Sequence, residues 1–297
     1  MFFLPLILYF GRYDFYIENE QMFFPLFKPY HTKVINIIYD IGLILFDTIQ
    51  TEKLTTTWRR LLPISLKNSD YILTISESSQ RDIEMYLKSI NLKKEVDYIY
   101  CDANLSDTTR DDSKINTFKK FNIQNDYFLF LGTLEPRKNP LNLVKAFHKF
   151  KTDNPEYSIK LVFAGRKGWL YDDVMDYIMQ YSLQNEIIFT GYISDEEKYV
   201  LLQNAKAFLF LSIYEGFGIP PLEALKLKTP CLVSDIPVFH ELFGENVLYV
   251  PHSDIFEIAD GMKRILSNPP KISPKAFDKF GWDKSVKKLV EFMKKHL

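Results

Sequence analysis

The stretch SIYEGFGIPPLEAL, residues 212–225, decides which fold this sequence predicts. It follows the apolar run AFLFL at 207–211, which is typical of a buried strand. The pair Pro220-Pro221 marks a helix start, because the N–H that proline lacks has no intrahelical partner in the first turn. The residues therefore predict a strand, a glycine loop and a helix in succession, as in an α/β fold.

The loop within this stretch carries the groups of a phosphate-binding site. Gly216 and Gly218 bring bare backbone amides to the positive end of the expected helix, which suits an anion. Glu215 and Glu223 add two carboxylates, one on the loop and one inside the helix. An ordinary strand-to-helix turn with two solvated glutamates is the alternative that these residues leave open.

The spacing of Glu215 and Glu223 resembles the E-x7-E motif of the retaining glycosyltransferases of the GT-B group, usually called family 4. The run TPCLVS at 229–234 continues the similarity. Three upstream segments are similar to the family's first phosphate-contacting loop and its next two strand ends, in the expected order: FLGTLEPRKN at 130–139, LVFAG at 161–165 and FTGY at 189–192. The similarity runs from about residue 127 to the C-terminus and, more weakly, back to about residue 14.

The resemblance implies an α/β fold of the GT-B type, in which two Rossmann-type domains with parallel sheets face one another across a cleft. We expect residues 1–110 to form a partial acceptor-side domain and residues 111–282 to form the nucleotide-sugar donor domain. A terminal helix at 283–297 would pack back on the first domain, and the polar stretch 106–113 is the expected linker. Because the N-terminal Gly-rich loop of full-length relatives has no counterpart here, we expect the first domain to be incomplete.

Composition excludes several classes of protein. The 297 residues suggest two domains, and 46% hydrophobic residues are too many for a disordered chain. A net charge of −1 gives no electrostatic support for binding nucleic acid. Cys101 and Cys231 lie in apolar runs and the five histidines form no ligand-spaced pair, so we expect no disulfide or metal site, and a cytoplasmic setting. The resemblance to the family implies no cofactor, only the nucleotide sugar as donor substrate.

The first ten residues, MFFLPLILYF, are strongly apolar. They lack a basic region and a cleavage site, which argues against a signal peptide, and they are too few to span a bilayer. Three interpretations stay open: a core segment, a foot on the membrane surface, or the remnant of a longer domain. The second would be a peripheral contact with the inner face of the membrane.

Short apolar runs alternate with helical patterns from residue 127 onward, which is typical of a parallel sheet. We expect strands there at 127–131, 159–164, 186–189, 207–211, 231–234 and 247–250, and helices at 141–151, 172–182, 195–204, 221–227 and 255–266. In the less regular first half we expect strands at 15–17, 34–39, 71–75 and 98–101, and helices at 56–67 and 80–89. The last expected helix is 284–295.

The resemblance assigns the loop after residue 131 to the diphosphate of the donor. Lys138, as a point charge, and Arg137, through bidentate contacts, would neutralise the phosphates beside Gly132. Many relatives have an arginine directly after this glycine, where the chain has Thr133. The alternative for the Arg-Lys pair is a solvated basic turn.

The helix-start motif would bind the sugar end of the donor. The resemblance implies that Glu223 accepts hydrogen bonds from the ribose hydroxyls and that Glu215 meets the donor sugar, with the amides of Gly216, Phe217 and Gly218 near the sugar and phosphates. Glu223 has an alternative as a helix N-terminal acid, and Phe217 as a core residue.

Further positions match the family less specifically. Tyr192 and Ile193 match the loop that flanks the nucleotide base, with ordinary packing as the alternative. Arg166 and Lys167 follow another strand end, where a solvated turn is the stronger interpretation. Lys228 stands where relatives often have a helix-capping glycine, which predicts mild strain or a different turn.

The first half contributes Tyr39 and Asp40, which align with a strand-end His-Asp pair that relatives place beside the donor sugar. Tyrosine donates one hydrogen bond but does not change charge near neutral pH, as histidine does. Asp40 would orient a hydroxyl, or form an Asx turn.

The resemblance implies transfer of a hexose from a nucleotide diphosphate sugar to a saccharide or lipid-linked saccharide. The anomeric configuration would be retained without a metal, in surface polysaccharide biosynthesis. A catalytically weak or inactive nucleotide-sugar-binding module that acts with a partner chain is the alternative, favoured by Tyr39 and the incomplete first domain.

Overall fold

The computed structural model describes residues 4–19, 30–46, 52–103, 105, 112–166, 168 and 172–297. They divide into two compact units, each of which is described by itself. The first unit comprises Met1–Cys101, Glu215–Phe217 and Lys279–Leu297, and the second comprises Asp102–Tyr214 and Gly218–Asp278. Most of the expected linker at 106–113 lies outside the described residues.

The first unit is built on a parallel four-stranded sheet in the order β1-β2-β3-β4. The strands are β1 (Phe15–Glu18), β2 (Lys33–Ile37), β3 (Tyr71–Thr74) and β4 (Glu95–Tyr98). The helices are α1 (Leu4–Gly11), α2 (Gly42–Leu45), α3 (Glu52–Asn68), α4 (Glu77–Ser89) and α12 (Trp282–Lys295).

Helices cover both faces of this sheet. Neighbouring residues of a strand point to opposite sides, so apolar neighbours put side chains on both faces that must be covered. Ile72 of β3 packs with Leu62 of α3 and Ile83 of α4. Its neighbour Leu73 packs on the other side with Phe292 of α12. The last helix of the chain therefore completes the core of the first unit.

The second unit is built on a parallel six-stranded sheet in the order β10-β9-β8-β5-β6-β7. The strands are β5 (Tyr127–Leu131), β6 (Lys160–Ala164), β7 (Ile187–Gly191), β8 (Ala207–Phe210), β9 (Cys231–Ser234) and β10 (Leu248–Val250). The helices are α5 (Ser113–Lys120), α6 (Pro140–Asp153), α7 (Asp172–Gln180), α8 (Asp195–Asn204), α9 (Ile219–Lys226), α10 (Pro237–Phe243) and α11 (Ile255–Ser267). Short 3₁₀ helices are η2 (Pro136–Lys138), η3 (Gly244–Asn246) and η4 (Pro274–Phe277).

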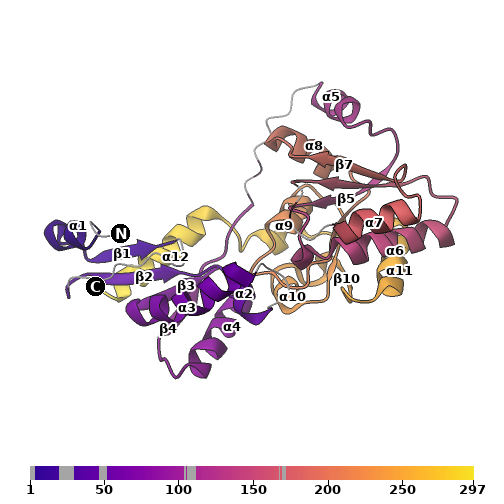
Figure 1. Ribbon diagram of the computed structural model, residues 1–297. Coiled ribbons are helices and arrows are strands. Elements are labelled where there is room, and N and C mark those ends of the chain that lie inside the picture. The colour runs from indigo at the N-terminus through magenta and orange to yellow at the C-terminus, as the bar shows by residue number, and fades with distance from the viewer. Residues whose placement is uncertain are drawn as a thin grey trace. The chain divides into compact units, whose positions relative to one another are not determined.

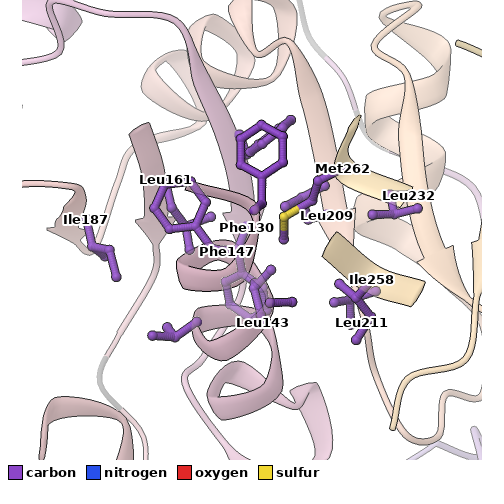
Figure 2. Close-up of a cluster of buried hydrophobic side chains, with 14 of the residues drawn as sticks. Phe130, Leu143, Phe147, Leu161, Ile187, Leu209, Leu211, Leu232, Ile258 and Met262 are labelled. Atoms are coloured by element: carbon purple, nitrogen blue, oxygen red, sulfur yellow. The ribbon is translucent and has the colours of Figure 1, made fainter. Parts of the chain in front are cut away.

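The main core of the second unit lies where α6 and α11 pack side by side on one face of the sheet (Figure 1). Figure 2 shows Phe147 of α6 and Met262 of α11 beside Phe130 of β5 and Leu209 of β8. On the opposite face, Phe239 of α10 contacts the ring of Phe210. Cover on both faces explains why these strands are apolar without alternation.

The prediction of an α/β fold with two parallel sheets, the first of them smaller, is confirmed. The expected strand at 98–101 is wrong: the chain pairs at Glu95–Tyr98, with Tyr71 opposite Glu95 and Thr74 opposite Tyr98. This strand lies at the edge of the sheet, where charged residues are tolerated, so the more apolar run that follows was misleading. The short helices α1, α2, α5 and α10 were not expected.

The apolar N-terminal run forms α1, with Leu8 buried and its neighbours Ile7, Tyr9 and Phe10 exposed. The core interpretation therefore holds for Leu8 alone among these four residues. Within the described ranges, none of the helices combines the length and the apolar character needed to cross a membrane.

Candidate functional site

Three glycines stand at the carboxyl ends of three adjacent strands of the second unit. Gly132, Gly165 and Gly191 follow or end β5, β6 and β7, with φ angles of +146°, +142° and +69°. A Cβ atom on Gly165 would lie 2.1 Å from the carbonyl oxygen of Gly132. Both the backbone angle and the close approach therefore require glycine there. Ligands of open α/β sheets bind at this edge.

Lys138 is positioned at the same edge by the loop after β5. The loop ends in η2, and Asn139 then adopts a left-handed conformation before α6 begins. The Lys138 ammonium lies 4.4 Å from the centre of the Phe210 ring, at the end of β8. An aromatic face attracts a cation, so Phe210 helps to hold this charge where a ligand at the strand ends would meet it.

Arg137 lies in a different environment. Its Nη2 donates to Glu135 Oε1 at 2.8 Å and its Nη1 to the Tyr214 carbonyl oxygen at 3.1 Å. The backbone N–H of Ile213 donates to the Arg137 carbonyl oxygen at 2.8 Å. Arg137 thus ties the loop after β5 to the loop after β8, a role that the sequence did not predict.

Glu223 is nearly buried in α9, with 3% of its surface exposed, and Lys198 of α8 holds it. Lys198 Nζ lies 2.7 Å from Glu223 Oε1 and 3.3 Å from Oδ1 of Asp195. Burial raises the pKa of the Glu223 carboxyl above its ordinary value, although Lys198 opposes this. Burial lowers the pKa of Lys198, but its bonds to Glu223 and Asp195 outweigh this and raise it.

Local sequence does place Lys198 on α8. Ser194 caps that helix and forms a capping box with Glu197, as its Ser-Asp-Glu-Glu sequence indicates. The partnership with Glu223 was missed, because the two residues are 25 positions apart and meet only when α8 packs beside α9.

The start of α9 follows Gly218, its N-cap residue, which has φ of +159° and makes no side-chain cap. A Cβ atom there would lie 3.0 Å from the Phe239 ring. Pro220 and Pro221 fall in the first turn, as expected. The positive end of this helix therefore stays uncapped by a side chain.

Tyr192 and Ile193 follow β7. Tyr192 is 71% exposed, and the guanidinium of Arg166 lies 5.0 Å from the centre of its ring. Ile193 is half-buried. Thr133 and Gly132 are half-buried as well, at the neighbouring strand end, and Lys167 lies outside the described residues. The exposed aromatic face of Tyr192 can stack on a planar ring.

The tripeptide Glu215–Phe217 groups with the first unit. Gly216 lies so close to the end of β2 that an added Cβ atom would be 2.7 Å from Asp40 Cβ and 3.0 Å from the Tyr39 carbonyl oxygen. The hydroxyls of Ser76 and Ser79 donate to the Gly216 carbonyl oxygen at 2.7 and 3.1 Å. The first unit therefore brings Tyr39 and Asp40 to the residue that follows Glu215.

The side chains of Asp40, Tyr39 and Phe217, all in the first unit, differ in their surroundings. Asp40 Oδ1 accepts from the Gly42 N–H at 2.8 Å, the Asx arrangement that was one of its two alternatives. Tyr39 is 40% exposed. Phe217 is buried and contacts the rings of Tyr100 and Phe280, as a core residue does. In the described part of the chain, no group of three or more His, Cys, Asp or Glu side chains is arranged to hold a metal ion.

Comparison with known proteins adds the family context. The model of the family described as "Glycosyl transferases group 1" matches residues 112–282. The O-antigen chain mannosyltransferase RfbU of Salmonella typhimurium is 32% identical over 217 residues, which are 73% of this chain and 56% of that protein. The serotype-specific mannosyltransferase WbdA of Escherichia coli is 29% identical over 57% of this chain and 21% of its own length. The chain thus spans about half, or less, of these relatives.

Two solved structures share the fold. A sucrose-phosphate synthase from Thermosynechococcus elongatus has a TM-score of 0.72 at 18% identity, over 96% of this chain and 74% of that one. The Anabaena protein Alr3699/HepE, in complex with UDP and glucose, also has a TM-score of 0.72, at 15% identity, over 89% of this chain and 72% of that one. The two parallel sheets are those of the GT-B fold, as expected.

Proposed function

Because the chain belongs to the group 1 glycosyl transferases, we propose that it transfers a hexose from a nucleotide diphosphate sugar to a hydroxyl of a saccharide or lipid-linked saccharide. The observation that carries the proposal is the set of polar groups at the edge of the six-stranded sheet where the carboxyl ends of its strands lie. Lys138, the uncapped start of α9 and the carboxylate of Glu223 all belong to loops or helices that follow its strands. A cation, amides and a hydrogen-bond acceptor are what a nucleoside diphosphate requires.

The leaving diphosphate gains negative charge as the bond to the sugar breaks. The ammonium of Lys138 and the amides at the start of α9 would stabilise that charge, which lowers the barrier to transfer. Glu223 would accept from the ribose hydroxyls, and Tyr192 would stack on the base. Arg137, which is bonded to Glu135 and Tyr214, would hold the loop that presents Lys138.

Glu215 would contact the transferred sugar, with the Gly216 backbone held by Ser76 and Ser79. Asp40 and Tyr39 lie beside Gly216 and would contact the sugar hydroxyls. We propose retention of the anomeric configuration without a metal, on the resemblance of 215–223 to the E-x7-E motif. Proton NMR of the anomeric signal of the first product distinguishes retention from inversion.

Two relatives are named as an O-antigen chain mannosyltransferase and a serotype-specific mannosyltransferase, so mannose is the first sugar to test. We propose that the chain acts in surface polysaccharide assembly, on the cytoplasmic side of the membrane. The acceptor would be a growing saccharide or one carried on a lipid.

The test measures binding of UDP, GDP and ADP to the full chain by calorimetry. Lys138→Ala should make the free energy of nucleotide binding less favourable by about 1.5–3 kcal/mol, the usual contribution of a charge-assisted hydrogen bond. Lys145→Ala is the matched control. The ammonium of Lys145 also lies over an aromatic ring, that of Tyr177, but Lys145 belongs to α6 and not to the loop after β5. Equal affinity of the wild type and Lys138→Ala would remove Lys138 from the site.

A nucleotide-sugar-binding module with little or no turnover is the second candidate. The observation that favours it is Tyr39, which by resemblance matches a histidine of the family and offers a phenol hydroxyl in place of an imidazole. Incubation with UDP- and GDP-sugars and analysis of the products separates the two functions. Donor binding without transfer or hydrolysis would support the module, and robust turnover would exclude it.

A further inference from the structure

Glu223 faces a chemical conflict within the second unit. An ionised carboxylate accepts the strongest hydrogen bonds from ligand hydroxyls, but burial favours the neutral form of the group. Glu223 is 3% exposed, and burial raises its pKa. The strands that α9 packs on, β8 and β9, carry no ionisable side chain other than the buried thiol of Cys231, whose pKa burial raises well above its ordinary value.

Lys198 supplies what those strands do not. Among the described residues, its ammonium is the hydrogen-bond partner of Glu223, at 2.7 Å from Oε1. The side chain of Lys198 is 19% exposed, and within the described ranges the other charged group that acts on the pair is Asp195, whose side chain is 86% exposed. Water therefore reaches Asp195 freely, whereas Lys198 meets Glu223 away from most of the solvent.

We propose that Lys198 is a positioning residue of the donor site, which fixes the Glu223 carboxylate through Oε1 and leaves Oε2 to accept from a ligand hydroxyl. The inference rests on the proposed function, because it takes the ligand to be a ribonucleotide. Lys198 acts through Glu223 and does not touch the ligand itself. Its loss should therefore affect recognition of the ribose and leave the contribution of the phosphates intact.

The experiment compares the wild-type chain with Lys198→Met, which keeps the aliphatic stem and removes the charge. Calorimetry measures the affinity for the nucleoside diphosphate that the wild type binds and for its 2′-deoxy analogue. The wild type should prefer the ribonucleotide by about 10- to 100-fold, the usual effect of a hydrogen bond to a charged group. Lys198→Met should lose most of this preference, and Lys198→Arg should keep it.

Two controls separate positioning from other effects. Lys206→Met removes a lysine of the same unit that is paired with Asp126 at 3.3 Å on the surface, and it should change neither affinity. In a Glu223→Gln background, Lys198→Met should have no further effect, because the carboxylate through which it acts is gone. If the two substitutions instead add in full, Lys198 contacts the ligand directly and the proposal is overturned.

A second readout needs no ligand. Carbon NMR of labelled glutamate side chains follows the titration of Glu223, whose signal is the one missing from Glu223→Gln. Lys198→Met should raise the pKa of Glu223, and an unchanged titration would overturn the proposal. A wild type that binds none of the nucleoside diphosphates would overturn the proposed function itself, whereas a wild type that binds while Lys198→Met keeps the ribose preference would overturn only the inference.

Discussion

Neighbouring residues of the loop after β5 have different tasks. Lys138 presents its charge on the ring of Phe210, while Arg137 is bonded to Glu135 and to the Tyr214 carbonyl. The sequence presents the two as one basic pair, and only tertiary structure separates them. The residue type at a position that matches a family motif therefore does not show whether the side chain contacts the ligand or holds the loop in place.

Arg137→Ala should destabilise the fold. Glu135 is buried and would lose the partner that balances its charge, which costs several kcal/mol at a fully buried site. Since the Arg137 side chain is 23% exposed, we expect a smaller loss, about 2–3 kcal/mol. Denaturant unfolding measures it, with Lys138→Ala as the control that should change stability little. The double variant Arg137→Ala with Glu135→Gln should recover part of the loss, and no recovery would argue against the ion pair.

Glu223→Gln should separate stability from binding. Because the pKa of Glu223 is raised in the folded state, its favourable contribution is complete below the unfolded pKa, near 4.5, and is lost as pH rises through the folded pKa. Ionisation of the carboxyl above its folded pKa therefore removes that favourable contribution. We expect Glu223→Gln to unfold at the same or a higher temperature than the empty wild type, yet to bind nucleotide more weakly. A strong loss of stability at pH 7 would contradict this account.

At the scale of elements, most of the second unit could be predicted and less of the first. The strands 127–131 and 231–234 and the helix 195–204 were predicted to the residue, because two-sided burial requires continuous apolar runs and capping residues mark helix ends. The strand Glu95–Tyr98 was missed because an edge strand needs few apolar residues. The family prediction is confirmed by the family model. The roles of the candidate site residues stay predictions, because they depend on a ligand.

The end of α9 carries a strain that sequence comparison indicated. Lys228 has φ of +62°, and the bonds from Lys228 to Leu225 and from Thr229 to Ala224 form the helix-ending pattern that favours glycine. Lys228→Gly should therefore stabilise the chain by about 0.5–1 kcal/mol, after the entropy cost of glycine is subtracted. Thermal unfolding measures the gain. Lys228→Ala is the control, because alanine removes the charge but keeps the Cβ atom, and an equal gain from both would point to charge instead of backbone strain.

At the scale of the whole molecule, the candidate residues form two groups, one in each unit. The second unit carries Lys138, Tyr192 and Glu223 at the edge of its six-stranded sheet, and the first carries Tyr39 and Asp40 beside Gly216. The central claim is that the nucleotide binds at the edge of the six-stranded sheet.

Hydrogen–deuterium exchange of the full chain, with and without saturating UDP, GDP or ADP, tests that claim most directly. Bound nucleotide should slow exchange of backbone amides in three segments: 132–139, 191–193 and 216–223. The strands β1 to β4 and the helix α12 should exchange as before, because they lie outside the proposed contacts. Binding that leaves all three segments unchanged, or that protects only β1 to β4, would contradict the account.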